Sequence, residues 1–443
     1  MIGIISYSLL LLALFIGAWR RPAIGVAAVL CLYGLKQWGQ SSTAIVAEYR
    51  QFTNYAIFVI VLIGVIRVAI KRSCVLCRAP TVAVLVLVLY VYALLSVTWS
   101  VDPANSFEQW IASAPYLVMI ALLAPLLISS LDDVYVAFVW TGLAAGAICA
   151  LALFLGHWGD RGLVVFGHQA LEDSSNIYLY ETNPLALSTL AGTAFVIAAL
   201  LLGRANGTPL RVFALICIPI ALAVVLRSGS RGQLIGSVIS LLIALPIAFR
   251  IKDTRSLSAL FAIAVVVLGL GLWSASLVEI NASRWANSQA TEDVAGRFEM
   301  AQALLSASAS GLLTTIFGLG NSSSFQVLGF YPHIAGLEVL AEEGIVGASI
   351  YIAIIILTIR SIRRIGSHQQ LTDRGRGALA MLSGLFVFEL ILSWKQGTLL
   401  FSVYVFAYAI MLGRLESPDV NSAPALSGTS DAGIVRRFSN LLR

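Results

Sequence analysis

The stretch LRVFALICIPIALAVVLRSGSRGQLIGSVISLLIALPIAFR, residues 210–250, contains two apolar runs joined by only five residues, RSGSR (227–231). Each run is close to the roughly 20 helical residues that cross the core of a bilayer. So short a link predicts an antiparallel pair of membrane-spanning helices with Arg227 and Arg231 at the membrane boundary. Gly229, between the two arginines, permits the tight turn.

The same apolar character extends over most of the chain. Of its 443 residues, 59% are hydrophobic and only 11% are charged, and the mean hydropathy is +0.91. An average soluble domain carries about 25% charged residues. The composition therefore excludes a soluble enzyme, a disordered protein and a nucleic-acid binder, despite the net charge of +6. We expect an all-α polytopic membrane protein.

Thirteen stretches have the length and apolarity of a membrane span. The first two are short and either can be a half-span, so we expect 12 or 13 transmembrane helices. The first run has no basic residues before it and no small-residue cleavage site after it, so we expect no cleaved signal peptide. The stretches are 2–18, 22–38, 55–70, 81–99, 111–128, 134–156, 183–203, 210–226, 232–250, 257–277, 344–360, 378–393 and 397–413.

The distribution of basic residues over the connecting loops predicts the orientation. One set of alternate loops, with the C-terminal tail, holds 19 basic and seven acidic residues, whereas the other set holds eight basic and 14 acidic residues. Basic residues favour the cytoplasmic side. We therefore expect the first set of loops to be cytoplasmic, with a transmembrane domain over residues 1–413 and a cytoplasmic, disordered tail over 414–443.

Two loops on the opposite, outer side are too long to be simple connectors: residues 157–182 and 278–343. Long loops in compact proteins are usually functional or disordered. The apolar spacing in VAGRFEMAQALLSASAS (294–310) predicts an amphipathic helix lying flat on the membrane interface. A second short helix is expected from about His333 to Gly344.

The arginines of this acidic side are the first candidates for a binding site. Arginine at membrane depth costs about 2.5–3.5 kcal/mol on insertion scales, and a bound anion can compensate that cost. Its planar guanidinium group suits phosphate. The simpler interpretation is that Arg227 and Arg231 extend to the lipid headgroups. Arg297 lies in the predicted interfacial helix, which can fold over the membrane boundary where Arg227 and Arg231 lie. This third arginine favours the anion site.

Two further features of the long loop bear on chemistry. The Gly/Asn/Ser-rich turn FGLGNSSSF (317–325) offers backbone N–H groups that can bind an oxyanion. YPH (331–333) follows, and its His333 is one of only four histidines in the chain. A histidine with a pKa near neutrality suits the deprotonation of a hydroxyl group.

These segments, in this order, resemble the superfamily of O-antigen ligases and O-antigen polymerases, the bacterial envelope glycosyltransferases. The resemblance covers roughly residues 180–410 and rests on order and topology together. In the last block the family usually has asparagine after the histidine, where this chain has Ile334. The matching segments are ETNPLALSTLAG (181–192), SRGQLIG (230–236), GRFEMAQALL (296–305), IFGLGNSSSF (316–325) and PHIAGLEVLAEEGIVGASIY (332–351).

The resemblance implies a membrane glycosyltransferase that moves a glycan from undecaprenyl pyrophosphate to a sugar hydroxyl of lipid A–core at the periplasmic face. It implies that Arg231 and Arg297 hold the pyrophosphate and that His333 activates the acceptor. Fixed cations can stabilise the leaving pyrophosphate, so we expect no metal and no other cofactor, and transfer with inversion. Besides the lipid-linked donor and the lipid A–core acceptor, we expect contacts with membrane lipids and no nucleic acid.

Other residues are secondary candidates. Arg161, Asn183 and Arg227 can line the path of the donor or contact headgroups, and Glu338 can orient His333, although a solvated position is the simpler interpretation. Glu389 lies within a predicted span, where an ionisable residue marks a functional site by default. For Glu389 a structural pairing with a buried polar group is the preferred alternative.

Two other functions remain open at this point. A polymerase of the same superfamily would use the same donor and the same arginines but a second lipid-linked glycan as acceptor. A transporter of lipid-linked sugars would place cations along an aqueous cavity at mid-membrane depth in two corresponding halves. The outer cations of this sequence lie together at one membrane boundary, which favours a glycosyltransferase over a transporter.

Overall fold

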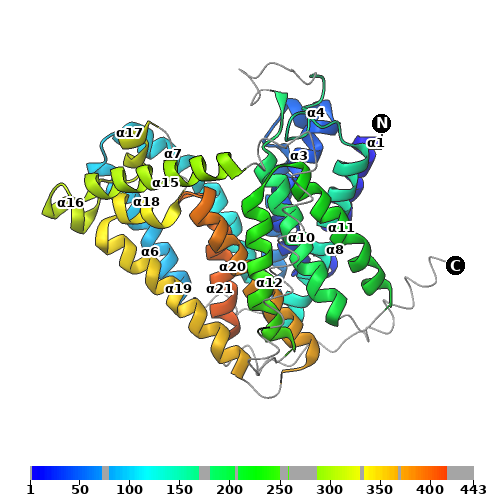
Figure 1. Cartoon of the computed structure of the whole chain (residues 1–443). Coiled ribbons are helices and arrows are strands. Elements are labelled where there is room, and N and C mark those ends of the chain that lie inside the picture. The colour runs from blue at the N-terminus through cyan, green and yellow to red at the C-terminus, as the bar shows by residue number, and fades with distance from the viewer. Residues whose placement is uncertain are drawn as a thin grey trace.

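The computed structural model describes residues 2–71, 79–168, 180–204, 208–249, 258, 287–329, 334–367 and 371–416. Within these ranges the chain is helical apart from two isolated β-bridges (Figure 1). Its helices are α1 (Ile2–Arg20), α2 (Ile24–Leu30), α3 (Leu32–Ser42), α4 (Ala44–Glu48), α5 (Phe52–Lys71), α6 (Thr81–Ser96), η1 (Val97–Trp99), α7 (Pro103–Tyr116), η2 (Leu117–Leu123), η3 (Ala124–Leu127), α8 (Leu131–Leu155), α10 (Pro184–Arg204), α11 (Thr208–Arg227), α12 (Arg231–Phe249), α15 (Asn287–Ser308), α16 (Leu312–Phe317), α17 (Ser323–Leu328), α18 (Ala335–Glu342), α19 (Gly344–Ser367), α20 (Asp373–Gln396) and α21 (Val403–Glu416).

Ten helical segments in the described part of the chain are long and apolar enough to cross a membrane. A helix satisfies its own backbone hydrogen bonds, which an apolar solvent requires. The prediction of a multi-pass, all-helical membrane protein is therefore confirmed. The ten segments are α1, α5, α6 with η1, α7 with η2 and η3, α8, α10, α11, α12, α19 and α20.

Three predicted spans have a different form in the structure. The second, 22–38, is divided into α2 and α3 by a break at Cys31, and the last, 397–413, becomes helical only at Val403. The predicted span 111–128 begins earlier, at Pro103, and widens into a π-helical segment just after Pro115. Proline lacks the backbone N–H that donates to the residue four positions earlier, so Pro115 interrupts the regular hydrogen-bonding pattern of α7. The predicted span 257–277 lies outside the described residues apart from Ser258.

The core of the bundle is built on α10 and α20. Both are 72% buried over their apolar windows, more than any other of the ten candidate spans in the described part of the chain. α20 packs against α8, α10, α12 and α21. Small residues allow this close packing, because the α-carbon of Gly192 faces the ring of Phe388 and that of Gly384 faces Ala244. The two central helices thus hold their side chains in a rigid frame.

Shorter helices cover one end of the bundle. In Figure 1, α15 lies across this end beside α16, α17 and α18, whereas the spans run away from it. α15 packs on α17 and α18, and α18 packs on α19 and α20. We call these helices, described residues 287–329 and 334–342, the cap, and the end that they cover the cap end. The predicted helices 294–310 and 333–344 are confirmed as α15 and α18, with α15 beginning seven residues earlier.

The opposite end of the bundle is held by ion pairs. Arg21, after α1, binds Asp132 at the start of α8, and Arg374 of α20 binds the same carboxylate at 2.8 Å. Arg364 of α19 pairs with Glu416 of α21. The charges at this end therefore serve to join helices.

Candidate functional site

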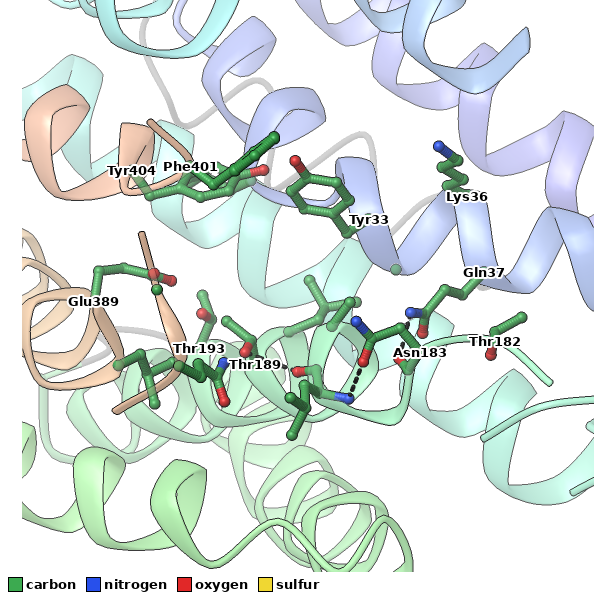
Figure 2. Close-up of a pocket in the computed structure, with 18 of the residues that line it drawn as sticks. Tyr33, Lys36, Gln37, Thr182, Asn183, Thr189, Thr193, Glu389, Phe401 and Tyr404 are labelled. Carbon is green, nitrogen blue, oxygen red and sulfur yellow. Dashed lines mark hydrogen bonds between the residues drawn. The ribbon is translucent and has the colours of Figure 1, made fainter. Parts of the chain in front are cut away.

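A pocket of about 550 Å³ lies at the cap end between α3, α10, α20 and α21. Its volume is within the range of roughly 300–1,000 Å³ that is usual for small-ligand sites. The irregular segment 397–402, between α20 and α21, and residues 181–183, before α10, complete its walls. Figure 2 shows side chains from several of these elements facing the same space.

The wall of the pocket combines aromatic rings with hydroxyl and amide groups. Tyr33 and Tyr404 meet edge to face, with their ring centroids 6.1 Å apart, and Phe401 lies beside Tyr404 (Figure 2). Thr189 and Thr193 of α10 line another side (Figure 2). Rings offer apolar faces, and hydroxyls and amides offer both donors and acceptors. This combination suits a ligand that carries many hydroxyl groups on a carbon ring.

Two cations lie on one side of the pocket. Lys36 of α3 is half-buried and Arg50, after α4, is exposed, and the two are close enough to repel each other electrostatically. Among the described residues, no carboxylate forms an ion pair with either of them. The pocket wall also contains Glu181, but its carboxylate accepts hydrogen bonds from the backbone N–H groups of residues 160–162. The two cations therefore retain their capacity to bind an anion.

Glu389 faces the same pocket from α20. It lies two helical turns from Gln396, which is about 10 Å along the helix axis, and on the other side of the pocket from Lys36 (Figure 2). The pairing expected for Glu389 with a buried polar group is absent, because no described residue forms an ion pair or hydrogen bond with its carboxylate. The prediction was wrong because the pocket, and not another helix, faces this side of α20.

Asn183, a predicted site residue, lies at the pocket. Its side-chain oxygen accepts a hydrogen bond of 2.9 Å from the N–H of Leu185 and so begins α10 as an N-cap. Its carbonyl oxygen accepts from the amide nitrogen of Gln37. This bond fixes the amide orientation, so that the Gln37 Oε1 atom is buried beside the pocket without a partner among the described residues.

Arg227 and Arg161 join a loop to the bundle. Arg227 donates to the carbonyl oxygens of Asp160 (2.8 Å) and Gly159 (3.0 Å) and lies over the ring of Trp158. Arg161 donates in the opposite direction, to the carbonyl oxygen of Ser228 in the α11–α12 turn, at 3.0 Å. Neither arginine belongs to the described lining of the pocket. Their contacts support a structural role in place of the predicted ligand contact.

Arg231 begins α12 next to the wall of the pocket. The α-carbon of the following Gly232 faces the side chain of Lys395. Two residues after Arg231, the amide of Gln233 donates to Gln396, a lining residue, at 2.9 Å and accepts from Lys395 at 3.3 Å. The start of α12 and the end of α20 thus place two more cations beside the pocket.

Arg297 belongs to the cap and is half-buried on α15. α15 rests on α18, and α18 reaches the end of α20, where the α-carbon of Gly336 faces the ring of Trp394. Arg231 therefore lies at the end of the bundle, and Arg297 lies in the cap that covers this end. His333 lies outside the described residues, which resume at Ile334, directly before α18.

Glu338 is buried, so the expectation of a solvated position was wrong. Its side chain is 3% exposed, and Oε1 accepts a hydrogen bond of 3.1 Å from the N–H of Leu399. α18 turns this carboxylate toward the segment 397–402, one face of which lines the pocket. Burial raises the pKa of the Glu338 carboxyl well above its usual range. Glu338 therefore holds a wall of the pocket in place.

The turn 317–325 does bind an oxyanion, but the oxyanion is the protein's own. The N–H groups of Ser322 (2.7 Å) and Ser324 (3.0 Å) donate to the carboxylate of Glu342, as does the Ser324 hydroxyl. Gly320 and Ser322 adopt positive φ angles of 91° and 57°, which aim these N–H groups inward. The prediction of a ligand site in this turn was wrong because Glu342, 18 to 20 residues further on, occupies it.

Sequence reasoning missed Lys36 and Gln37. The signal was available in LKQWGQ (35–40), where polar side chains interrupt a predicted span. Glu389 was noticed, but its neighbours Tyr33 and Tyr404 come from helices more than 300 residues apart, which no local pattern connects. Among the described residues, no group of three or more His, Cys, Asp or Glu side chains is placed to hold a metal ion.

Comparison with known proteins completes the description of the site. No protein-family model matches this chain, and no curated protein is significantly similar to it.

Proposed function

We propose that this protein is an O-antigen ligase-type glycosyltransferase, which transfers a glycan from undecaprenyl pyrophosphate to a sugar hydroxyl of lipid A–core. The observation that carries the proposal is the pocket at the cap end. Its polar and aromatic wall suits a sugar, and Lys36 and Arg50 offer two cations without a carboxylate partner among the described residues. A glycan linked to a diphosphate has both of these chemical features.

The diphosphate is the leaving group of the proposed reaction. Cations held in place before the reaction stabilise the charge that develops as the bond between the sugar C1 and the phosphate oxygen breaks. Lys36 and Arg50 at the pocket, with Arg231 and Lys395 beside its wall, supply this stabilisation. In the resemblance, Arg231 and Arg297 are the residues that hold the pyrophosphate, and Arg297 acts from the cap.

The acceptor hydroxyl needs a base. In the proposal its oxygen attacks C1, its proton passes to the imidazole of His333, and undecaprenyl pyrophosphate leaves from the opposite face, which inverts the anomeric centre. This role of His333 follows from the resemblance. The structure supports it only through the neighbouring segment, because α18 begins two residues later and contacts both α15 of the cap and α20 of the bundle.

The proposal includes an orientation in the membrane. The loops at the cap end are the acidic set, so this end faces the periplasm by the positive-inside rule and the ion-paired opposite end faces the cytoplasm. With the divided pair α2–α3, the short α21 and the predicted span 257–277, the ten candidate spans extend to 12 or 13 crossings of the inner membrane. The cap belongs to the long loop that the proposal places in the periplasm.

A deletion strain tests the proposal through its lipopolysaccharide, separated on a gel. A ligase is expected to leave lipid A–core without any long chains and to cause lipid-linked polymer to accumulate. Core with a single repeat unit would instead identify a polymerase, which uses the same donor. A normal ladder of long chains in the deletion strain would refute both. Complementation with His333→Ala is expected to restore no long chains, and restoration across neutral pH would refute the base.

A further inference from the structure

The pocket contains acceptor atoms that the protein itself leaves without donors. Gln37 is 5% exposed, and its Oε1 atom is buried beside the pocket with no partner in the described part of the chain. Its orientation is fixed, because the amide nitrogen donates to the carbonyl oxygen of Asn183. A buried acceptor without a donor is energetically unfavourable. A ligand that brings a donor would recover this cost.

The carboxylate of Glu389 is a second such acceptor. It projects from a central helix into the pocket, and among the described residues no cation or N–H group binds it. An ionisable group at this depth is expensive and usually has a partner. The hydroxyls of Tyr33, Tyr404 and Tyr408 lie within electrostatic range of this carboxyl group. Of these, the Tyr404 hydroxyl already donates to the carbonyl oxygen of Val29, at 3.0 Å.

The two acceptors and the two cations divide the pocket into unlike parts. Lys36, with Arg50 near it, offers positive charge on one side, and Glu389 offers a carboxyl group on the other side, across the pocket from Lys36 (Figure 2). Between them lie the rings of Tyr33 and Tyr404 and the buried oxygen of Gln37. An anion alone or an apolar chain would leave both acceptors without donors.

We infer that Glu389 and Gln37 Oε1 form a subsite for one sugar ring, whose hydroxyls donate to these two acceptors while an adjoining anionic group lies at Lys36 and Arg50. The inference rests on the proposed function for its choice of ligand and adds the residues that select the sugar. Glu389 is a specificity-determining residue in this account. Its side chain accepts hydrogen bonds from sugar hydroxyls, and no described group of the protein donates to it in their place. Sugars that lack these hydroxyls therefore bind weakly.

Binding of a sugar alone tests the subsite independently of transfer. The purified full chain in nanodiscs is titrated with methyl glycosides of glucose, galactose, rhamnose and N-acetylglucosamine, and binding is followed by saturation-transfer NMR. We expect at least one glycoside to bind, and Glu389→Leu to weaken its binding on the order of tenfold, because a hydrogen bond to a charged group is lost. Glu389→Gln keeps an acceptor oxygen and is expected to weaken it less.

The matched control is Glu416→Gln, which alters a glutamate that pairs with Arg364 at the opposite end. It is expected to bind the glycoside as the unaltered protein does. Should Glu389→Leu fail to fold, the comparison between Glu389→Gln and Glu416→Gln decides, with weaker binding required only in the former. Equal binding by the Glu389 variants and the control, or no binding of any glycoside to the unaltered protein, would overturn the subsite. If the unaltered protein binds the sugar but transfers no glycan, this result would count against the proposed function and not against the subsite.

Discussion

The pocket and the turn 317–325 of the cap are two polar regions at the same end of the molecule. They differ in whether their buried polar atoms have hydrogen-bond partners within the protein. In the turn, the carboxylate of Glu342 accepts hydrogen bonds from the N–H groups of Ser322 and Ser324, so these buried polar groups have partners within the protein. In the pocket, Gln37 Oε1 is buried without a donor from the described residues, and Lys36 has no carboxylate partner among them. Buried polar groups are normally paired. The difference indicates that the turn is a structural element and the pocket is a place for a ligand.

The comparison predicts opposite consequences for substitutions in the two regions. Changes at the pocket should reduce activity and leave the fold intact. Changes at the turn should destabilise the cap, and they should affect activity only as the cap is lost. Four substitutions test this division, in order of decreasing effect.

Arg231→Ala is expected to have the largest effect on transfer. Loss of one preorganised group that stabilises a developing anion costs about 10²–10³ in rate. We expect Arg231→Lys to restore little, because lysine cannot reproduce the two-pronged contact of arginine with phosphate. Transfer is measured with purified lipid-linked glycan and lipid A–core, and thermal melting in detergent serves as the control for folding. Near-normal transfer by Arg231→Ala would remove this residue from the site.

Glu342→Ala is expected to have the largest effect on stability. It leaves the buried N–H groups of Ser322 and Ser324 without an acceptor, at a cost of about 2–4 kcal/mol. Hydrogen exchange of these two amides measures the cap directly, and it should accelerate on the order of 100-fold. Glu342→Gln retains an acceptor oxygen and should have a smaller effect. Unchanged exchange in Glu342→Ala would contradict the structural role of the turn.

The stability of the cap should depend on pH in a particular direction. Burial raises the pKa of Glu343 to about 8 and that of Glu342 to about 7, from an ordinary value of 4.5. A carboxyl whose pKa is raised on folding stabilises the folded state below its unfolded pKa, and this contribution is lost as the pH rises through the folded value. We therefore expect the cap to weaken by roughly several kcal/mol between pH 5 and pH 9.

Exchange rates in the cap, corrected for the intrinsic effect of pH, measure this dependence. Glu343→Gln is the informative variant, because Glu343 is fully buried and accepts from Ser96 at 3.1 Å. The variant should have a shallower pH dependence than the unaltered chain. A cap that becomes more stable as the pH rises would show that these carboxyls are ionised in the folded protein.

Arg227→Gln is expected to have the smallest effect. The variant loses hydrogen bonds to Gly159 and Asp160 and the contact with the ring of Trp158, together worth about 1–2 kcal/mol at a partly exposed site. Transfer should fall less than tenfold, because the loop loosens while the pocket keeps its own residues. A loss as large as that of Arg231→Ala would return Arg227 to the ligand-binding residues.

Much of the architecture could be predicted because membrane spans are local. A run such as residues 232–250 must be a helix wherever it lies, since no other local structure satisfies its backbone in an apolar solvent. α11 and α12 accordingly begin and end within two residues of their predictions. The α2–α3 break and the late start of α21 could not be predicted, because close packing and the pocket, not composition, place them.

The sequence by itself determined that this chain is a multi-pass helical membrane protein with a turn suited to an anion and arginines at one end. Only the tertiary structure decided which acceptors and donors meet. In the folded chain the turn 317–325 binds the carboxylate of Glu342, and the segment 397–402 binds that of Glu338. Glu389 faces the pocket. The physical reason is that hydrogen bonds and charges act over a few ångströms, and packing brings together residues that are far apart in the chain.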